Sequence, residues 1–232
     1  MLVFTGTDRL MHFLWNAYED KDHRYHNLFL EHFRKIDQTI GEINSRVADD
    51  DLLIMLSDHG FEGLEKDVYI SYLLRQEGFL QFKQGEDIVL NNICYGTKAF
   101  VLEPARIYLN LKGKFPCGTV GPADSEETLQ QLENLYGSLR IDGRAVVRDI
   151  YRKEQIYSGP YLENAPDLVL VGAEGFNLKA NIETEHLADK SIFAGKHTQD
   201  TAFLLVKNNC GKKIVPQAPR VSDIKTIIEK LS

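Results

Sequence analysis

Aspartate and histidine recur in this sequence at spacings that suit a metal site. Asp8 and His12 are four residues apart in a segment that we expect to be helical, so their side chains share one face of its first turn. A carboxylate oxygen and an imidazole nitrogen in this arrangement can bind one cation, and zinc accepts both. The alternative is that Asp8 caps the helix and His12 is an ordinary surface residue. The same spacing at Asp22 and His26, in a charged loop, shows that spacing alone does not decide.

Asp58 and His59 form a second candidate pair, because they directly follow an apolar run and precede Gly60. Adjacent side chains reach one site only where the backbone is irregular, as at the end of a strand, and glycine lets the chain turn away sharply. The alternative is a solvated turn. Other acidic residues also precede histidine in this chain, at 22–23, 31–32 and 185–186.

His197 is the third candidate, in a loop of small residues ahead of an apolar segment. Its neighbour Lys196 has two interpretations. In the first, Lys196 lies in the pocket, where its charge would repel a dication unless a bound phosphate balances both charges. In the second, which we expect, the Lys196 side chain points to solvent.

Together the candidates are two carboxylates and three imidazoles, which suit zinc or manganese in a hydrolytic site. Two cations about 3.5–4 Å apart commonly activate a nucleophile and hold phosphoryl oxygens. Two metals need more ligands than these five residues offer. Thr5, Thr7 and Ser57 lie beside them, but each fits a strand or a turn better than an activated nucleophile.

The segments that must position these residues predict an α/β fold, with a mostly parallel sheet flanked by helices. Residues 2–7 and 52–56 are short and apolar, as in buried parallel strands, and an amphipathic helix lies between them over 33–47. Further buried strands are expected at 166–172 and 202–206. Ligands of open parallel sheets gather outside the carboxyl ends of the strands, where Asp8, Asp58 and His59 fall.

The remaining segments predict a mixed region. We expect helices at 67–75, closed by Gly78, at 124–136 and at 222–231, and short strands at 99–102 and 106–111. We treat residues 1–232 as part of one domain, in which roughly 83–165 form an insertion or cap beside the pocket.

Composition excludes several classes of protein. The 232 residues are 43% apolar and 26% charged, with a net charge of −7 and no basic run, which argues against binding to a nucleic-acid polymer. Cys94, Cys117 and Cys210 are odd in number and form no CxxC, which indicates a reducing compartment and a cytoplasmic location. No apolar run could cross a bilayer. The oligomeric state stays open.

Three ordered motifs resemble the type I phosphodiesterase/nucleotide pyrophosphatase branch of the alkaline phosphatase superfamily, especially its group of predicted phosphohydrolases. They are TDRLMHFLW at 7–15, LSDHGF at 56–61 and GKH at 195–197. The segments 106–113, 157–161 and 165–168 are also similar to that group. The resemblance covers nearly the whole chain and implies an incomplete alkaline-phosphatase-like core.

The resemblance implies that Asp8, His12 and His197 hold one metal ion. It implies a second ion at Asp58 and His59, completed by an earlier aspartate and a Thr or Ser nucleophile that normally lie upstream. We therefore expect a C-terminal fragment, inactive alone, that binds at most one metal well.

The intact protein would use two divalent ions, zinc first and manganese second, to hydrolyse a small phosphodiester or phosphomonoester. The alternatives are a sulfatase or phosphotransferase of the same superfamily, a non-catalytic metal-binding module, or a shortened homologue that starts naturally at Met1.

Overall fold

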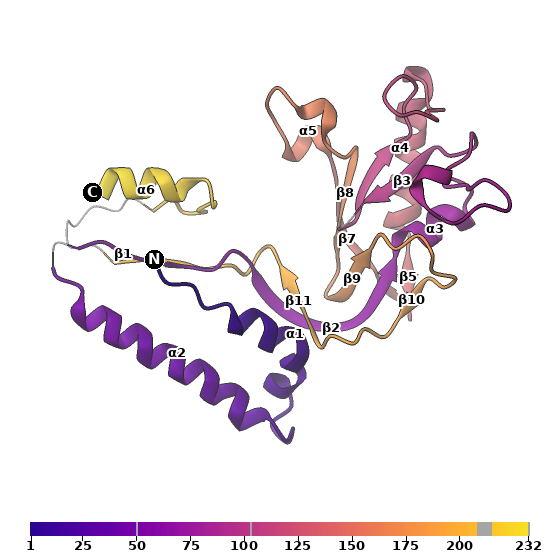
Figure 1. The fold of residues 1–232 in the computed structure, drawn as a ribbon. Helices are drawn as coiled ribbons and strands as arrows, with labels where there is room; N and C mark the ends of the chain where they lie inside the picture. Colours follow the sequence, from indigo (N-terminus) through magenta and orange to yellow (C-terminus); the bar gives the residue numbers. More distant parts are fainter. Residues whose placement is uncertain (50, 103, 208–214, 232) are drawn as a thin grey trace. The chain divides into compact units, whose positions relative to one another are not determined.

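The computed structural model describes residues 1–49, 51–102, 104–207 and 215–231, in two compact units (Figure 1). Unit 1 comprises Met1–Gly63 and Ile192–Ser232, and unit 2 comprises Leu64–Ser191. The expected cap at 83–165 falls inside unit 2 and stays a prediction. Cys94 and Cys117 are free thiols, and Cys210 lies outside the described residues.

Unit 1 contains three helices, α1 (Gly6–Glu19), α2 (His26–Arg46) and α6 (Asp223–Leu231). Its strands are β1 (Leu53–Leu56), β11 (Gly195–Thr198) and β12 (Leu204–Lys207). Strand β2 (Gly60–Tyr69) begins here, pairs with β11 and continues into unit 2. The helices α1 and α2 pack together, and Nδ1 of His26 donates a hydrogen bond to the carbonyl of Ala17. The predicted amphipathic helix is confirmed and begins earlier than expected, at His26.

The predicted strand at residues 2–7 is wrong. Leu2 and Val3 are mostly exposed, and α1 already begins at Gly6. Within the described part of the chain no strand pairs with this segment, so its apolar side chains stay in water and its backbone bonds are not made in a sheet. The apolar pattern therefore misled the assignment, since it signals a preference for burial and does not supply the neighbour.

The prediction of a mostly parallel sheet is also wrong. The apolar segments 52–56 and 202–206 do hold strands, β1 and β12, but these pair with each other and run antiparallel. Among the strand pairs of the described residues, only β2 with β9 (Gly175–Lys179) is parallel. An apolar run predicts that a strand is covered and leaves its direction open, because side-chain polarity is the same in both directions.

Unit 2 is built on a four-stranded antiparallel sheet in the order β3-β4-β8-β7. The strands are β3 (Ala99–Leu102), β4 (Arg106–Leu109), β7 (Val147–Arg152) and β8 (Leu168–Gly172). The helices α3 (Ile70–Gln76) and α4 (Pro122–Gly137) pack on it. The shorter elements are β5 (Arg140–Ile141), β6 (Arg144–Ala145), α5 (Lys153–Ile156), β10 (Ala188–Asp189) and the 3₁₀ turns Leu90–Asn92 and Leu162–Asn164.

The core of unit 2 lies between this sheet and its helices. Leu132 and Tyr136 of α4 are fully buried, and the Tyr136 hydroxyl donates to the carbonyl of Ile70. The strands predicted at 99–102, 106–111 and 166–172 and the helix at 124–136 are confirmed within a few residues. The helix predicted at 67–75 starts only at Ile70, because β2 runs on to Tyr69. Gly78 ends α3 with φ of +74°, a conformation that glycine adopts without a steric penalty.

Candidate metal centre

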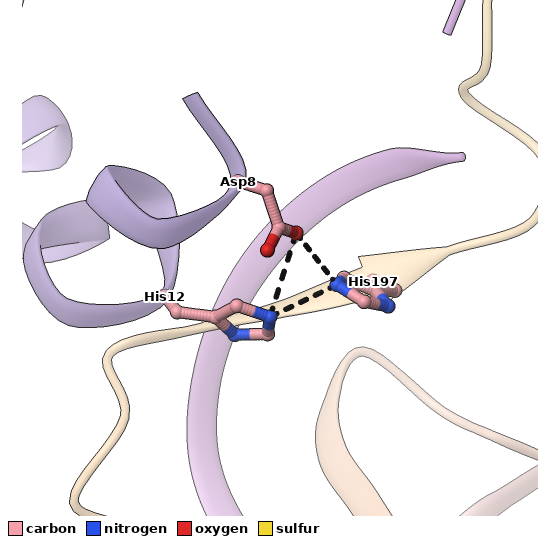
Figure 2. A group of neighbouring side chains, drawn as sticks. All are labelled: Asp8, His12 and His197. Carbon is pink, nitrogen blue, oxygen red and sulfur yellow. Dashed lines mark hydrogen bonds and ion pairs between the residues drawn. The ribbon is translucent and has the colours of Figure 1, made fainter. Parts of the chain in front are cut away.

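The first turns of α1 and the strand β11 bring Asp8, His12 and His197 together (Figure 2). Nε2 of His197 lies 2.9 Å from Oδ1 of Asp8 and 2.9 Å from Nε2 of His12. The third separation, from Nε2 of His12 to Oδ1 of Asp8, is 3.6 Å. Three ligand atoms separated by 189 residues of sequence thus converge on one point.

These separations fit one cation. Ligand atoms that each lie about 2 Å from a tetrahedral zinc ion are about 3.3 Å from one another, and the observed values fall on either side of that spacing. Two imidazole nitrogens and one carboxylate oxygen form a ligand set that zinc accepts. The three residues offer a possible Asp/His/His metal site.

Backbone contacts fix the orientation of His12. Its Nδ1 lies 3.0 Å from the carbonyl oxygen of Gly195. Because a carbonyl oxygen only accepts, Nδ1 carries the hydrogen, and Nε2 keeps its lone pair for a metal ion. In return the amide of Ala194 donates to the carbonyl of His12 at 2.7 Å. These two bonds tie the ligand helix to the segment that carries His197.

A pair of glycines lets α1 come this close. Gly63 and Gly195 are direct partners in the register of β2 and β11. A Cβ atom on Gly195 would lie 2.5 Å from the Phe61 ring, 2.6 Å from the carbonyl oxygen of Met11 and 2.9 Å from Cβ of Trp15. One on Gly63 would lie 3.0 Å from a carboxylate oxygen of Glu19. Any larger residue at Gly195 would therefore push α1, with Asp8 and His12, away from β11.

His59 lies beside this trio, and Asp58 stands apart from it. The His59 ring stacks on that of His197 with centroids 3.6 Å apart, and its Nε2 lies 3.8 Å from Oδ1 of Asp8. Nδ1 of His59 donates to the carbonyl of Gly60, which again leaves Nε2 as the free nitrogen. The side chain of Asp58 is 86% exposed, and its Oδ1 lies 3.7 Å from Nε2 of His59. The backbone bends at residues 58 and 59, and a Cβ atom on Gly60, where β2 begins, would clash with Thr198 and Thr201.

The pKa of His197 is lowered, so its imidazole favours the neutral form that binds metal. Burial is the largest cause, since it disfavours the charged ring, and the neighbouring His59 and His12 add to it. The hydrogen bond to Asp8 and the charge of Asp8 oppose the shift.

Lys196 neither points to solvent nor faces the metal site. Only 9% of it is exposed, and its Nζ lies 2.8 Å from Oε1 of Glu62. Sequence reasoning missed the roles of Glu62 and of Phe61, whose ring makes T-shaped contacts with those of His12 and His197. The available signal was the alternation of β2, which puts Phe61 on the site face and Glu62 on the other.

The second Asp–His pair of the same spacing is not part of the group of possible metal ligands found among the described residues, which is Asp8, His12 and His197. His26 uses Nδ1 to bond the carbonyl of Ala17, and the amide of Asp22 binds the carboxylate of Asp20. The hydroxyls near the metal ligands are also engaged elsewhere. Thr7 donates to the carbonyl of Phe4, and Ser57 accepts from the amide of Phe203.

Comparison with known proteins gives one match. A model of the family described as type I phosphodiesterase / nucleotide pyrophosphatase matches residues 1–200. No curated protein and no solved structure shows a significant match. Among the described residues, no helix is both long and apolar enough to span a membrane.

Proposed function

This chain belongs to the type I phosphodiesterase / nucleotide pyrophosphatase family, and from that premise we propose that it carries the metal site of a metal-dependent phosphoester hydrolase. The family itself suggests hydrolysis of a phosphoester. Our proposal adds three points to this: the reaction depends on a metal ion, a small phosphodiester is the preferred substrate, and single residues have the roles given below.

The convergence of Asp8, His12 and His197 is the observation that carries it. A bound divalent ion would polarise the phosphoryl oxygens and lower the pKa of the attacking group. Asp8, His12 and His197 would hold that ion, with the two backbone bonds of His12 fixing its ring. His59 and Asp58 would hold a second ion beside the first, for which His59 already lies close to Asp8.

The nucleophile in this proposal comes from outside the described residues. The hydroxyls of Thr7 and Ser57 are engaged with the backbone, and that of Thr198 is engaged with Thr201. His59 and Asp58 offer only two ligands to the second ion. The chain alone should therefore bind one ion well and turn over little substrate.

Calorimetry with zinc and with manganese tests the site. We expect one strong site per chain, and loss of that site in Asp8→Ala with His197→Ala, because two of three ligands are removed. Asp22→Ala with His26→Ala is the matched control, since it removes a pair of the same spacing that lies in the loop and start of α2.

Turnover of bis(p-nitrophenyl) phosphate by the metal-loaded chain tests the assignment of the nucleophile. We expect none above the metal-only blank. Robust turnover that His12→Ala abolishes would place the nucleophile within this chain. Unchanged metal affinity in the double ligand variant would overturn the metal site, and with it the proposed function.

A further inference from the structure

Strand β11 carries His197, and its register is not set by an apolar face. Its four residues, Gly-Lys-His-Thr, include no apolar side chain, so it lacks the hydrophobic alternation that sets the register of most strands. In the described structure it pairs with β2 alone. A slip of one residue turns every side chain to the opposite face. Lys196 would then replace His197 beside Asp8 and His12.

The face of β2 and β11 that points away from the metal ligands holds a cross-strand ion pair. Lys196 is the direct register partner of Glu62, and His197 is the partner of Phe61. The Lys196 side chain is 11% exposed and that of Glu62 is 26% exposed, with 2.8 Å between Nζ and Oε1. A buried ammonium group is costly unless a carboxylate accompanies it.

We propose that the Lys196–Glu62 ion pair is a register lock that holds His197, rather than Lys196, at the metal site. A slip by one residue would separate Lys196 from Glu62, and it would also carry the ammonium charge of Lys196 toward the metal ligands. Both changes raise the free energy of the slipped register. Buried ionic groups are best attested as devices that select one register over another. Lys196 and Glu62 are thus positioning residues, and the inference rests on the metal site of the proposed function.

The effect of the ion pair on strand register can be separated from its effect on stability by replacing Lys196 and Glu62 together. Replacing a buried ion pair by apolar residues often leaves stability unchanged or raises it. In Lys196→Met with Glu62→Leu, we expect the thermal unfolding midpoint to stay level or rise. Cobalt(II) affinity should nevertheless fall by about tenfold or more, as for other groups that orient metal ligands. The cobalt absorption band of the three-ligand site should weaken, because part of the population would lack His197.

Two further variants complete the test. Glu62→Gln keeps the side-chain volume and should weaken cobalt binding in the same direction. Lys66→Gln with Asp142→Asn breaks another ion pair of β2, 2.6 Å long and inside unit 2, and should leave cobalt affinity unchanged.

Wild-type affinity and an unchanged cobalt spectrum in the apolar variant would overturn the lock and leave Gly195 as the feature that fixes the register. Failure of the unmodified chain to bind cobalt would overturn the metal site and the lock together. The two failures are therefore distinguishable. A loss of affinity equal in the Lys66 control would also overturn the lock, because the effect would not be specific to Lys196 and Glu62.

Discussion

The two units of this protein differ in what their side chains do. Almost every buried apolar side chain belongs to unit 2, and in unit 1 the buried ones among the described residues are Ala17, Phe29 and Ile227. Unit 1 instead exposes large apolar side chains, among them Leu2, Val3, Phe13, Phe203 and Leu205. It also holds the metal-ligand candidates. The unit that holds the metal-ligand candidates is thus the unit with the smaller core.

This difference has a physical consequence. Burial of apolar surface is the main source of folding free energy, so unit 2 should be the more stable unit. Unit 1 gathers a carboxylate and three imidazoles, which contribute little until a cation binds them. Ligand binding to the folded state then adds stability by mass action.

The largest effect should come from the core of unit 2. Leu132→Ala removes a fully buried side chain of α4 and should lower the free energy of unfolding by about 2–5 kcal/mol. Hydrogen exchange should show the loss in unit 2, while cobalt affinity stays at the wild-type value. Gln130→Ala, on the exposed face of α4, is the control. A matching loss of protection in unit 1 would show that the units unfold together.

Zinc should act on the other unit. At a concentration of about 100 times its dissociation constant, it should stabilise unit 1 by about 2.7 kcal/mol. Hydrogen exchange of α1 and β11 should slow, and a chelator should reverse the effect. His12→Ala should abolish the response. Equal protection of the β3-β4-β8-β7 sheet would contradict the separation of the units.

A methyl group at Gly195 should harm the site more than the fold. Gly195→Ala forces Cβ against the Met11 carbonyl and should cost about 1–3 kcal/mol by overpacking. Metal affinity should fall because α1 moves away from His197. Gly41→Ala is the matched control in the same unit, since nothing lies within 4 Å of its Cβ. It should stabilise α2 by up to about 1 kcal/mol. Normal metal binding by Gly195→Ala would contradict the close-packing argument.

The smallest effect should be a pH dependence confined to unit 2. Hydrogen bonding to Arg152 lowers the pKa of Glu133, so the unfolded state takes up protons first as the pH falls. The ion pair contributes fully above the unfolded pKa, about 4.3, and its contribution is lost as the pH falls through the lower pKa of the folded state.

Glu133→Gln should therefore be less stable than wild type by about 1 kcal/mol or less at pH 7, because the pair is partly exposed. The gap should close below about pH 4. Chemical denaturation across this range measures it, with Glu154→Gln as an exposed control. A gap that persists at low pH would contradict the charge-based origin.

Local sequence patterns predicted many elements correctly. The helix at 124–136, the amphipathic helix and the strands of unit 2 follow from spacings that span a few residues, and local sterics and burial decide them. Strand direction and pairing were predicted wrongly, since they depend on which segments meet across long stretches of chain. The strand at 2–7 failed for the same reason.

The sequence by itself determined the chemical inventory: Asp8, His12, Asp58, His59 and His197, with no thiolate among them, and motifs in the order of one family. Only the tertiary structure decided which of these meet. It brought His197 onto Asp8 and His12 and left Asp58 exposed. It also turned Lys196 away to Glu62. Spacing along the chain orders side chains within one helix or strand, whereas the contact of α1 with β11 depends on strand register and on two glycines that only packing makes necessary.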